Sequence, residues 1–256
     1  MGEVPATENP VPVPPRRPRH RTVDRIADIL DMTAREPRGL SLTDIALRLG
    51  APVSSVQSLV NGLTAAGFLS EVDRRFTLGP APYVLNLTAG RQPVRSVRHD
   101  DLEMLSNITG CLVALGISVG GKVVYIDHFT VGNSNTTFVA ETHLGRPMLR
   151  TCIGRVLLAF SDKRDMYAYL TNADEAERPY VEGFMNEVDM IRETGLAVSR
   201  GYLQAGLTGI AAPIREDGRV VAAVGLVAAT ETVRHRIDAL GEVLRTHTAD
   251  WAQRPV

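Results

Sequence analysis

The stretch SLTDIALRLGAPVSSVQSLVNGLTAAGFL, residues 41–69, decides the fold of the N-terminal part of this chain. Ser41, followed three residues later by Asp44, matches a capping box that opens an apolar stripe at helical spacing. Gly50 suits a left-handed helix end, and Pro52 suits the start of a second helix that runs to about Ala66. The sequence therefore predicts two short helices joined by a tight turn, the helix-turn-helix arrangement.

The residues on both sides of this stretch extend the prediction. Residues 68–72 and 75–78 alternate like two strands around a tight turn at Asp73-Arg74, which predicts a β-hairpin wing. A helix begins near Thr22. Residues 1–20 hold six of the fifteen prolines, and four arginines lie between Arg16 and Arg21, so we interpret residues 1–20 as a disordered, basic, proline-rich arm.

The rest of the chain mixes helices with antiparallel hairpins. Strand pairs are expected over 111–119 with 122–128 and over 209–214 with 220–228, a further strand at 138–140, and a last helix over 231–251. Strands and helices do not alternate as βαβ units, which predicts an α+β domain with an antiparallel sheet. We therefore expect the arm at 1–20, a winged helix-turn-helix domain at 21–80, a linker helix at 81–93 and a second domain at 94–256.

Composition excludes several classes of protein. The chain has 256 residues, 44% of them hydrophobic and 22% charged, with a formal net charge of −1, which is ordinary for a globular protein. Cys111 and Cys152 cannot form a disulfide framework or a CxxC clip. Neither metal-ligand spacing of histidines nor a phosphate-binding glycine motif occurs, so we expect no metal and no cofactor. No apolar run approaches the ~20 residues that span a bilayer, so we expect a cytoplasmic protein without a membrane partner.

The outer face of the second helix carries short polar side chains that suit hydrogen bonds to base edges in a DNA major groove. Among them Gln57 could bind an adenine through two hydrogen bonds. A solvated helix face is the simple alternative, but arginines in the wing and in the arm suit contacts to phosphates and favour DNA binding. The predicted DNA-binding set is Arg19, Arg21, Thr43, Ser54, Ser55, Gln57, Ser58, Arg74 and Arg75.

Further blocks follow in order: LGRPMLRTCIGRVLLA at 144–159, IRETGLA at 191–197 and GLTGIAAPI at 206–214. With SLTDIALRLGAP at 41–52, Gly67–Leu69 and 76–79, they resemble IclR-type bacterial transcriptional regulators from about Arg21 to Trp251. The resemblance implies a winged-helix domain, a linker helix and a GAF-like effector-binding domain. It also implies assembly as dimers or dimers of dimers on operator DNA.

The resemblance further implies a ligand held at a helix N-terminus, where free backbone N–H groups bind a carboxylate or carbonyl oxygen. Cys152 and Ile153 match positions whose main chain touches the ligand in the family. Positions opposite them have few polar side chains and include Gly209 and Gly225, so we expect a roomier pocket for a larger, fairly apolar or aromatic metabolite. The predicted lining is Phe138, Met148, Cys152, Ile153, Gly154, Ser199, Arg200, Leu207, Gly209, Gly225 and Val227.

Each of these positions has a simpler alternative. Phe138, Met148 and Leu207 are also typical core residues, and Gly225 also suits close packing of strands. An acid group on the ligand would meet the loop N–H groups or Arg200.

Two departures from the family pattern lie in the recognition helix. Val53 and Ser58 stand where the family often has basic residues, so we expect affinity for DNA to depend more on the arm and the wing. The sequence predicts a ligand-responsive DNA-binding repressor or activator that is not an enzyme. One alternative is an enzyme that converts a small molecule with Cys152, since a thiol at a helix N-terminus can have a lowered pKa. Another is a sensing module whose DNA contacts have decayed.

Overall fold

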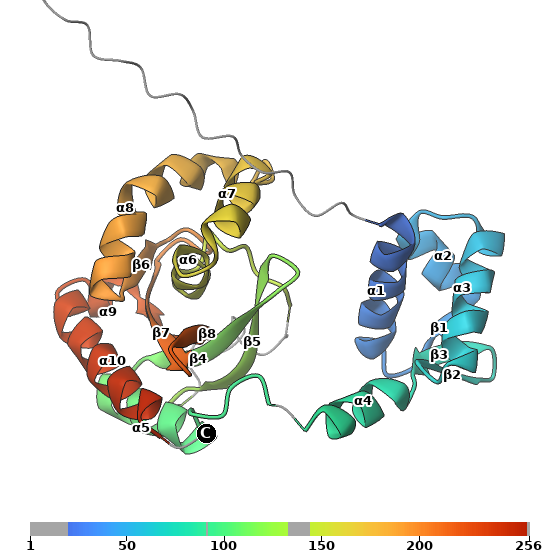
Figure 1. Cartoon of the computed structure of the whole chain (residues 1–256), viewed down its shortest axis with the longest axis horizontal. Coiled ribbons are helices and arrows are strands. Elements are labelled where there is room, and N and C mark those ends of the chain that lie inside the picture. Colours follow the sequence, from blue (N-terminus) through green and yellow to red (C-terminus); the bar gives the residue numbers. More distant parts are fainter. Residues whose placement is uncertain (1–19, 91, 133–143, 255–256) are drawn as a thin grey trace, which may run out of the picture. The chain divides into compact units, whose positions relative to one another are not determined.

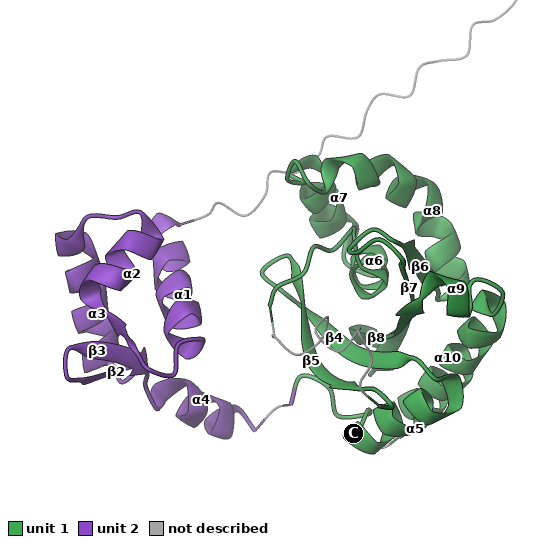
Figure 2. Cartoon of the chain, turned by 180° about the vertical axis from the view of Figure 1, so that it is seen from behind, with its two compact units in different colours: residues 1–16, 93–256 green, residues 17–92 purple. Residues whose placement is uncertain are grey.

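The computed structural model describes residues 20–90, 92–132 and 144–254, and its chain divides into two compact units (Figure 2). Residues 17–92 form one unit, and residues 93–256 lie in the other. Arg19, Phe138 and the strand expected at 138–140 lie outside the described residues.

The smaller unit, residues 17–92 (unit 2 in Figure 2), is a helix-turn-helix with a three-stranded sheet. Its elements are α1 (Arg21–Ala34), β1 (Leu40–Ser41), α2 (Leu42–Leu49), α3 (Val53–Ala65), β2 (Leu69–Val72), β3 (Arg75–Leu78) and α4 (Ala81–Ala89) (Figure 1). The antiparallel sheet has the order β1-β3-β2. One apolar core joins α1, α2, α3 and the hairpin, with Ile29, Ile45 and Val56 fully buried at its centre.

Local chemistry sets the ends of these elements. The capping box is present at the start of α2: the Asp44 backbone N–H donates to Ser41 Oγ at 3.2 Å, and the Ser41 N–H donates to Asp44 Oδ2 at 3.0 Å. Gly50 ends α2 with a φ of 57°, in the left-handed region. Asp73 and Arg74 both have positive φ, at 49° and 60°, which is typical of a type I′ turn that joins two twisted strands.

The larger unit, from residue 93 (unit 1 in Figure 2), is built on a five-stranded antiparallel sheet of order β5-β4-β8-β7-β6. The strands are β4 (Leu112–Val119), β5 (Lys122–Phe129), β6 (Ala197–Arg200), β7 (Leu207–Glu216) and β8 (Arg219–Ala229). Successive side chains of a strand point to opposite faces of the sheet. Because consecutive residues of β7 and β8 are buried, both faces of the sheet are apolar and both are covered.

Helices cover the two faces of this sheet separately. On one face lie α6 (Cys152–Ala159), α7 (Lys163–Thr171) and α8 (Val181–Thr194). The 3-10 turn η2 (Arg178–Tyr180) directly precedes α8 in the chain. On the other face lie α5 (His99–Thr109), α9 (Thr230–Val233) and α10 (Ile237–Ala252), which buries Trp251. The α+β class with an antiparallel sheet is therefore confirmed.

Two expectations about elements were wrong. The last helix is interrupted between Val233 and Ile237. At this interruption the Arg236 guanidinium donates to the Thr109 carbonyl at the end of α5. The strand β6 was not expected, because four residues carry too little periodicity. Its pairing with β7 defines it, from Ala197 opposite Ala211 to Arg200 opposite Thr208.

The start of the larger unit is tied to the β7–β8 hairpin and to the segment that follows α10. Glu216 Oε1 accepts from the backbone N–H groups of Arg95 at 2.7 Å and Ser96 at 2.8 Å. Arg254 donates to both carboxylate oxygens of Asp101, at 2.5 and 2.8 Å, and to the Ser96 carbonyl at 3.0 Å. Within the described ranges, no helix is long and apolar enough to cross a membrane.

Candidate functional site

The first candidate site is the exposed face of α3. The helix VSSVQSLVNGLTA contains no charged side chain. It buries Val56, Val60 and Leu63 against the core, which turns its polar residues outward. Ser54, Ser55 and Ser58 are exposed, whereas Gln57 is half-buried and its amide donates to Asn61 Oδ1 at 2.7 Å. Asn61, which the helical spacing also places on this outer face, is exposed.

The wing places its two arginines differently. Arg74 is exposed in the turn between β2 and β3, as the hairpin prediction requires. Arg75 begins β3 opposite Ser41 and Val72, and its guanidinium donates to the Gly39 carbonyl at 2.9 Å. Arg74 is therefore the arginine at the tip, while Arg75 also ties the wing to the segment before α2. Thr43 on α2 and Arg21 at the start of α1 are exposed.

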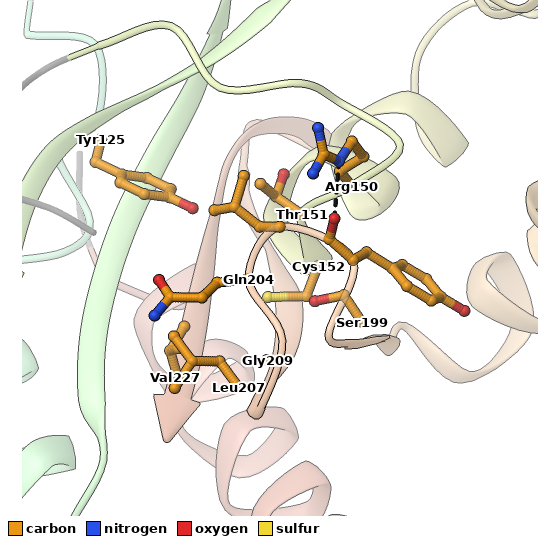
Figure 3. A pocket seen from close by; sticks show the side chains of 11 residues that line it. Tyr125, Arg150, Thr151, Cys152, Ser199, Gln204, Leu207, Gly209 and Val227 are labelled. Carbon is orange, nitrogen blue, oxygen red and sulfur yellow. Dashed lines mark hydrogen bonds between the residues drawn. The ribbon is translucent and has the colours of Figure 1, made fainter. Parts of the chain in front are cut away.

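The second candidate site is a small cavity at the N-terminus of α6 (Figure 3). Thr151 caps this helix, since its hydroxyl accepts from the Gly154 N–H at 3.0 Å. The loop ahead of the helix is held by Glu177, whose carboxylate accepts from the Leu149 N–H at 2.6 Å and from the Tyr169 hydroxyl. The lining consists of Tyr125, Arg150, Thr151, Cys152, Ser199, Tyr202, Leu203, Gln204, Leu207, Gly209 and Val227.

Sequence reasoning found only part of this lining. Cys152, Ser199, Leu207, Gly209 and Val227 were in the predicted set and line the cavity. Tyr125, Arg150, Thr151, Tyr202, Leu203 and Gln204 were missed. For Arg150 and Thr151 a signal existed, because they directly precede Cys152 in the block at 144–159. Tyr202–Gln204 enter through the loop after β6, a strand that was not expected.

Other predicted residues lie beside the cavity rather than on its wall. Met148, Ile153 and Gly154 are buried in the core around α6. Arg200 is exposed and does not line the cavity. Its neighbour Ser199 is buried there, and successive side chains of a strand point to opposite faces, which explains why Arg200 cannot join it. Arg150 is the cation in the lining, and its Nε donates to the Tyr202 carbonyl at 2.7 Å, the dashed line in Figure 3.

The two glycines do not open free space beside their own backbone. A Cβ at Gly209 would stand 2.7 Å from Cys152 Sγ, and one at Gly225 would stand 2.9 Å from Ile153 Cγ1. Both spaces are thus filled by side chains from the start of α6. The remaining cavity is about 30 Å³, room for roughly two water molecules.

The thiol of Cys152 is not activated. Burial raises its pKa to about 11, and this effect outweighs the hydrogen bonds from the Ile153 N–H and Ser199 that favour the thiolate. Burial therefore outweighs the helix N-terminus here, and the thiol stays protonated at neutral pH.

Comparison with known proteins gives the same family from both units. The profile described as "IclR helix-turn-helix domain" matches residues 22–73, and the profile described as "Bacterial transcriptional regulator IclR C-terminal" matches residues 87–252. The regulator XynR of Escherichia coli is 27% identical over 224 residues, which cover 83% of this chain and 88% of that protein. The regulator KdgR of Escherichia coli is 27% identical and covers 84% of each chain.

Solved structures agree with these matches. An IclR transcriptional regulator from Silicibacter sp. TM1040 superposes with a TM-score of 0.75 at 26% identity, over 91% of this chain and 95% of that one. An IclR homolog from Microbacterium hydrocarbonoxydans, complexed with 4-hydroxybenzoate, has a TM-score of 0.66 at 21% identity, over 90% and 97%. With a winged helix-turn-helix followed by an α+β domain that carries a buried pocket, the chain belongs to the IclR family of ligand-responsive bacterial transcriptional regulators.

Proposed function

We propose that α3 and the wing of this regulator bind operator DNA, with residues 21–80 as the DNA-binding domain and 81–93 as the linker helix. The observation that carries this proposal is the exposed polar face of α3 beside an arginine-tipped wing, within a winged helix-turn-helix. Short hydroxyl and amide side chains suit base edges, and Arg74 suits phosphates. Arg19 and Arg21 add charge ahead of or at the start of α1.

We further propose that residues 94–256 bind an effector with an apolar or aromatic body and one anionic group. Leu203, Leu207 and Val227 supply apolar surface, while Arg150 and the N-terminus of α6 favour a negative charge. Among the described residues, Arg150 contacts the Tyr202 carbonyl and the Tyr180 ring, neither of which neutralises its charge. Arg150 takes the role that the sequence suggested for Arg200.

Size also supports a ligand response. Sites for metabolites and drug-sized ligands usually enclose about 300–1,000 Å³, whereas this cavity offers about 30 Å³. An effector with a ring must therefore widen it. A ligand that binds only the widened form shifts the protein toward that form, which gives effector binding a physical means of acting on the rest of the chain.

Binding is favoured over catalysis at this site. The enzyme alternative needs a nucleophilic thiolate at Cys152, but the pKa of about 11 leaves very little thiolate at neutral pH. Alkylation with iodoacetamide tests this choice: an enzyme would lose turnover, whereas a regulator would at most change its ligand response.

We propose a dimer or a dimer of dimers as the functional assembly. None of the side chains of α4 is buried, and Tyr83, Val84, Leu85 and Leu87 are each more than half exposed. Four large apolar side chains on a nine-residue helix are more than a single solvated helix normally exposes, and a second copy that covers them would also place two α3 helices on paired half-sites.

Two measurements test the proposed function. Fluorescence anisotropy with the gene's own upstream DNA, at low and at physiological salt, should show specific binding, and no association at low ionic strength would contradict DNA recognition. Calorimetry with benzoate, 4-hydroxybenzoate and neutral benzamide should show binding of the acids that falls in Arg150→Ala and persists in Arg200→Ala. Tight binding of a two- or three-carbon acid, with none of the larger compounds, would contradict the effector class.

A further inference from the structure

Two amide side chains on α3, those of Gln57 and Asn61, are hydrogen-bonded to each other in the absence of DNA. Gln57 and Asn61 lie one helical turn apart, and Gln57 Nε2 donates to Asn61 Oδ1 at 2.7 Å. The two side chains belong to the same polar surface as Ser54 and Ser58, on a helix without a charged side chain. Ser58 is the neighbour on that surface, and its hydroxyl already donates to the Ser54 carbonyl at 3.4 Å.

The bond between the amides leaves a defined set of groups for a partner. An amide side chain has an acceptor oxygen and a donor nitrogen. With Gln57 Nε2 and Asn61 Oδ1 joined, the oxygen of Gln57 and the nitrogen of Asn61 make no bond within the pair, and Gln57 Nε2 keeps its second hydrogen. If both amides were reversed, the free groups would again be one donor and one acceptor, so the pair offers the same pattern in either orientation.

This pattern fits one base better than the others. In the major groove adenine presents the N7 acceptor beside the N6 donor. A guanine presents two acceptors, a cytosine only a donor, and a thymine an acceptor beside a methyl group. Only adenine engages both the free oxygen and a free nitrogen of the pair, whereas a guanine would leave the oxygen of Gln57 without a donor. Because the mutual hydrogen bond already restricts both side chains, less conformational entropy is lost on binding.

We propose that Gln57 and Asn61 act together as a single reader of an adenine in the operator, a proposal that rests on α3 being the recognition helix. The pair replaces the arginine-to-guanine contact that is the commonest specific contact in protein–DNA complexes, since α3 carries no arginine. Base specificity at this position then comes from amides, while the arginines outside α3 supply the contacts to phosphate.

Selection from a random duplex library with the full chain tests the pair and does not require a known operator sequence. Wild type, Gln57→Ala, Asn61→Ala and the double variant would be compared, with Asn186→Ala as the control, an exposed amide on α8. We expect one adenine in the wild-type motif whose preference over other bases, about tenfold or more, falls to near unity in all three α3 variants. The control should select the wild-type motif.

A second measurement tests the contact on the DNA side. Replacing that adenine by 7-deazaadenine removes the N7 acceptor, so wild-type affinity should fall about tenfold. The double variant should be indifferent to the same replacement, because two partners of one contact are not additive. The wild-type part of this test does not depend on how any variant folds.

The outcomes separate this proposal from the proposed function. If wild type selects no motif, DNA recognition by α3 fails and the amide pair fails with it. If wild type selects a motif that Gln57→Ala and Asn61→Ala leave unchanged, the two amides contact only each other. The adenine proposal is then overturned, while DNA recognition by α3 stands. A guanine at the affected position would also overturn it.

Discussion

Replacing Gly209 by alanine tests how the ligand cavity is packed. The new methyl group would stand 2.7 Å from Cys152 Sγ and 3.1 Å from Ser199 Oγ, whereas ordinary contacts lie at 3.4–4 Å. Cys152 is buried at the start of α6 with core residues around it, so the sulfur cannot move aside without displacing them. We expect Gly209→Ala to lower the free energy of unfolding by about 1–3 kcal/mol, the usual range for overpacking a core.

Cys152→Ala supplies the matching change, because it removes the sulfur that the new methyl group meets. Alone it should cost about 1 kcal/mol, for a lost buried atom and the small cavity that remains. In the double variant the methyl group of residue 209 occupies part of the vacated space. The double variant should therefore be about 1–2 kcal/mol more stable than the sum of the single changes predicts.

Urea unfolding followed by Trp251 fluorescence measures these differences, because the chain has a single tryptophan and it is buried in α10 of the same unit. Gly183→Ala is the control: its Cβ would meet nothing within 4 Å on α8, so its stability should be unchanged or slightly raised. Additive effects of the two changes, within about 0.5 kcal/mol, would refute the packing argument. So would a Gly209→Ala protein as stable as wild type.

Three further predictions concern contacts elsewhere in the chain. Burial works to raise the pKa of Glu216, but the N–H groups of Ser96 and Arg95 outweigh it and hold the pKa below its ordinary 4.5. Glu216→Ala should therefore cost about 2–4 kcal/mol at pH 7, and Glu216→Gln, which keeps an acceptor oxygen, about 1 kcal/mol. The extra stability of wild type over the Gln variant should be fully present above pH 4.5 and should be lost as the pH falls through the lowered pKa of Glu216. Thermal unfolding across an acid series measures this difference in stability. A difference that persists in strong acid would contradict a role for the Glu216 carboxylate. Arg74→Ala should weaken binding to all DNA sequences and reduce the slope of log affinity against log salt by about one unit, whereas Arg219→Ala, at the β7–β8 hairpin, should leave the anisotropy titrations unchanged. Leu87→Arg on α4 should shift the mass measured by light scattering toward the monomer, since it places a charge among exposed apolar side chains, and an unchanged mass would count against α4 as the contact between copies.

Local signals explain which elements could be predicted from the sequence. The capping box at Ser41, the left-handed glycine at position 50 and the turn at Asp73-Arg74 each depend on a few adjacent residues, and all three are present in the structure. The helix-turn-helix, the wing and the α+β class were confirmed for the same reason. The strand β6 was missed because its identity comes from pairing with β7, which follows further along the chain.

At the ligand site, too, local features could be predicted from the sequence and contacts between distant segments could not. The block around Cys152 located the helix N-terminus correctly, since the sequence motif and the cap are local. Arg200, which was expected beside the loop N–H groups as a partner for an acid group, does not line the cavity, because the register of β6 turns Ser199 inward and Arg200 outward. Arg150 and Tyr202 meet through a contact between segments that are 52 positions apart.

By itself, the amino-acid sequence determined the winged helix-turn-helix, the class of the second domain and the family, because these follow from periodicity, caps, turns and ordered motifs. Only the tertiary structure decided how much space lies beside Gly209 and Gly225, which cation lines the cavity and whether the Cys152 thiol ionises. Each of these depends on which side chain from a distant segment occupies the neighbouring volume, and on the water that it excludes.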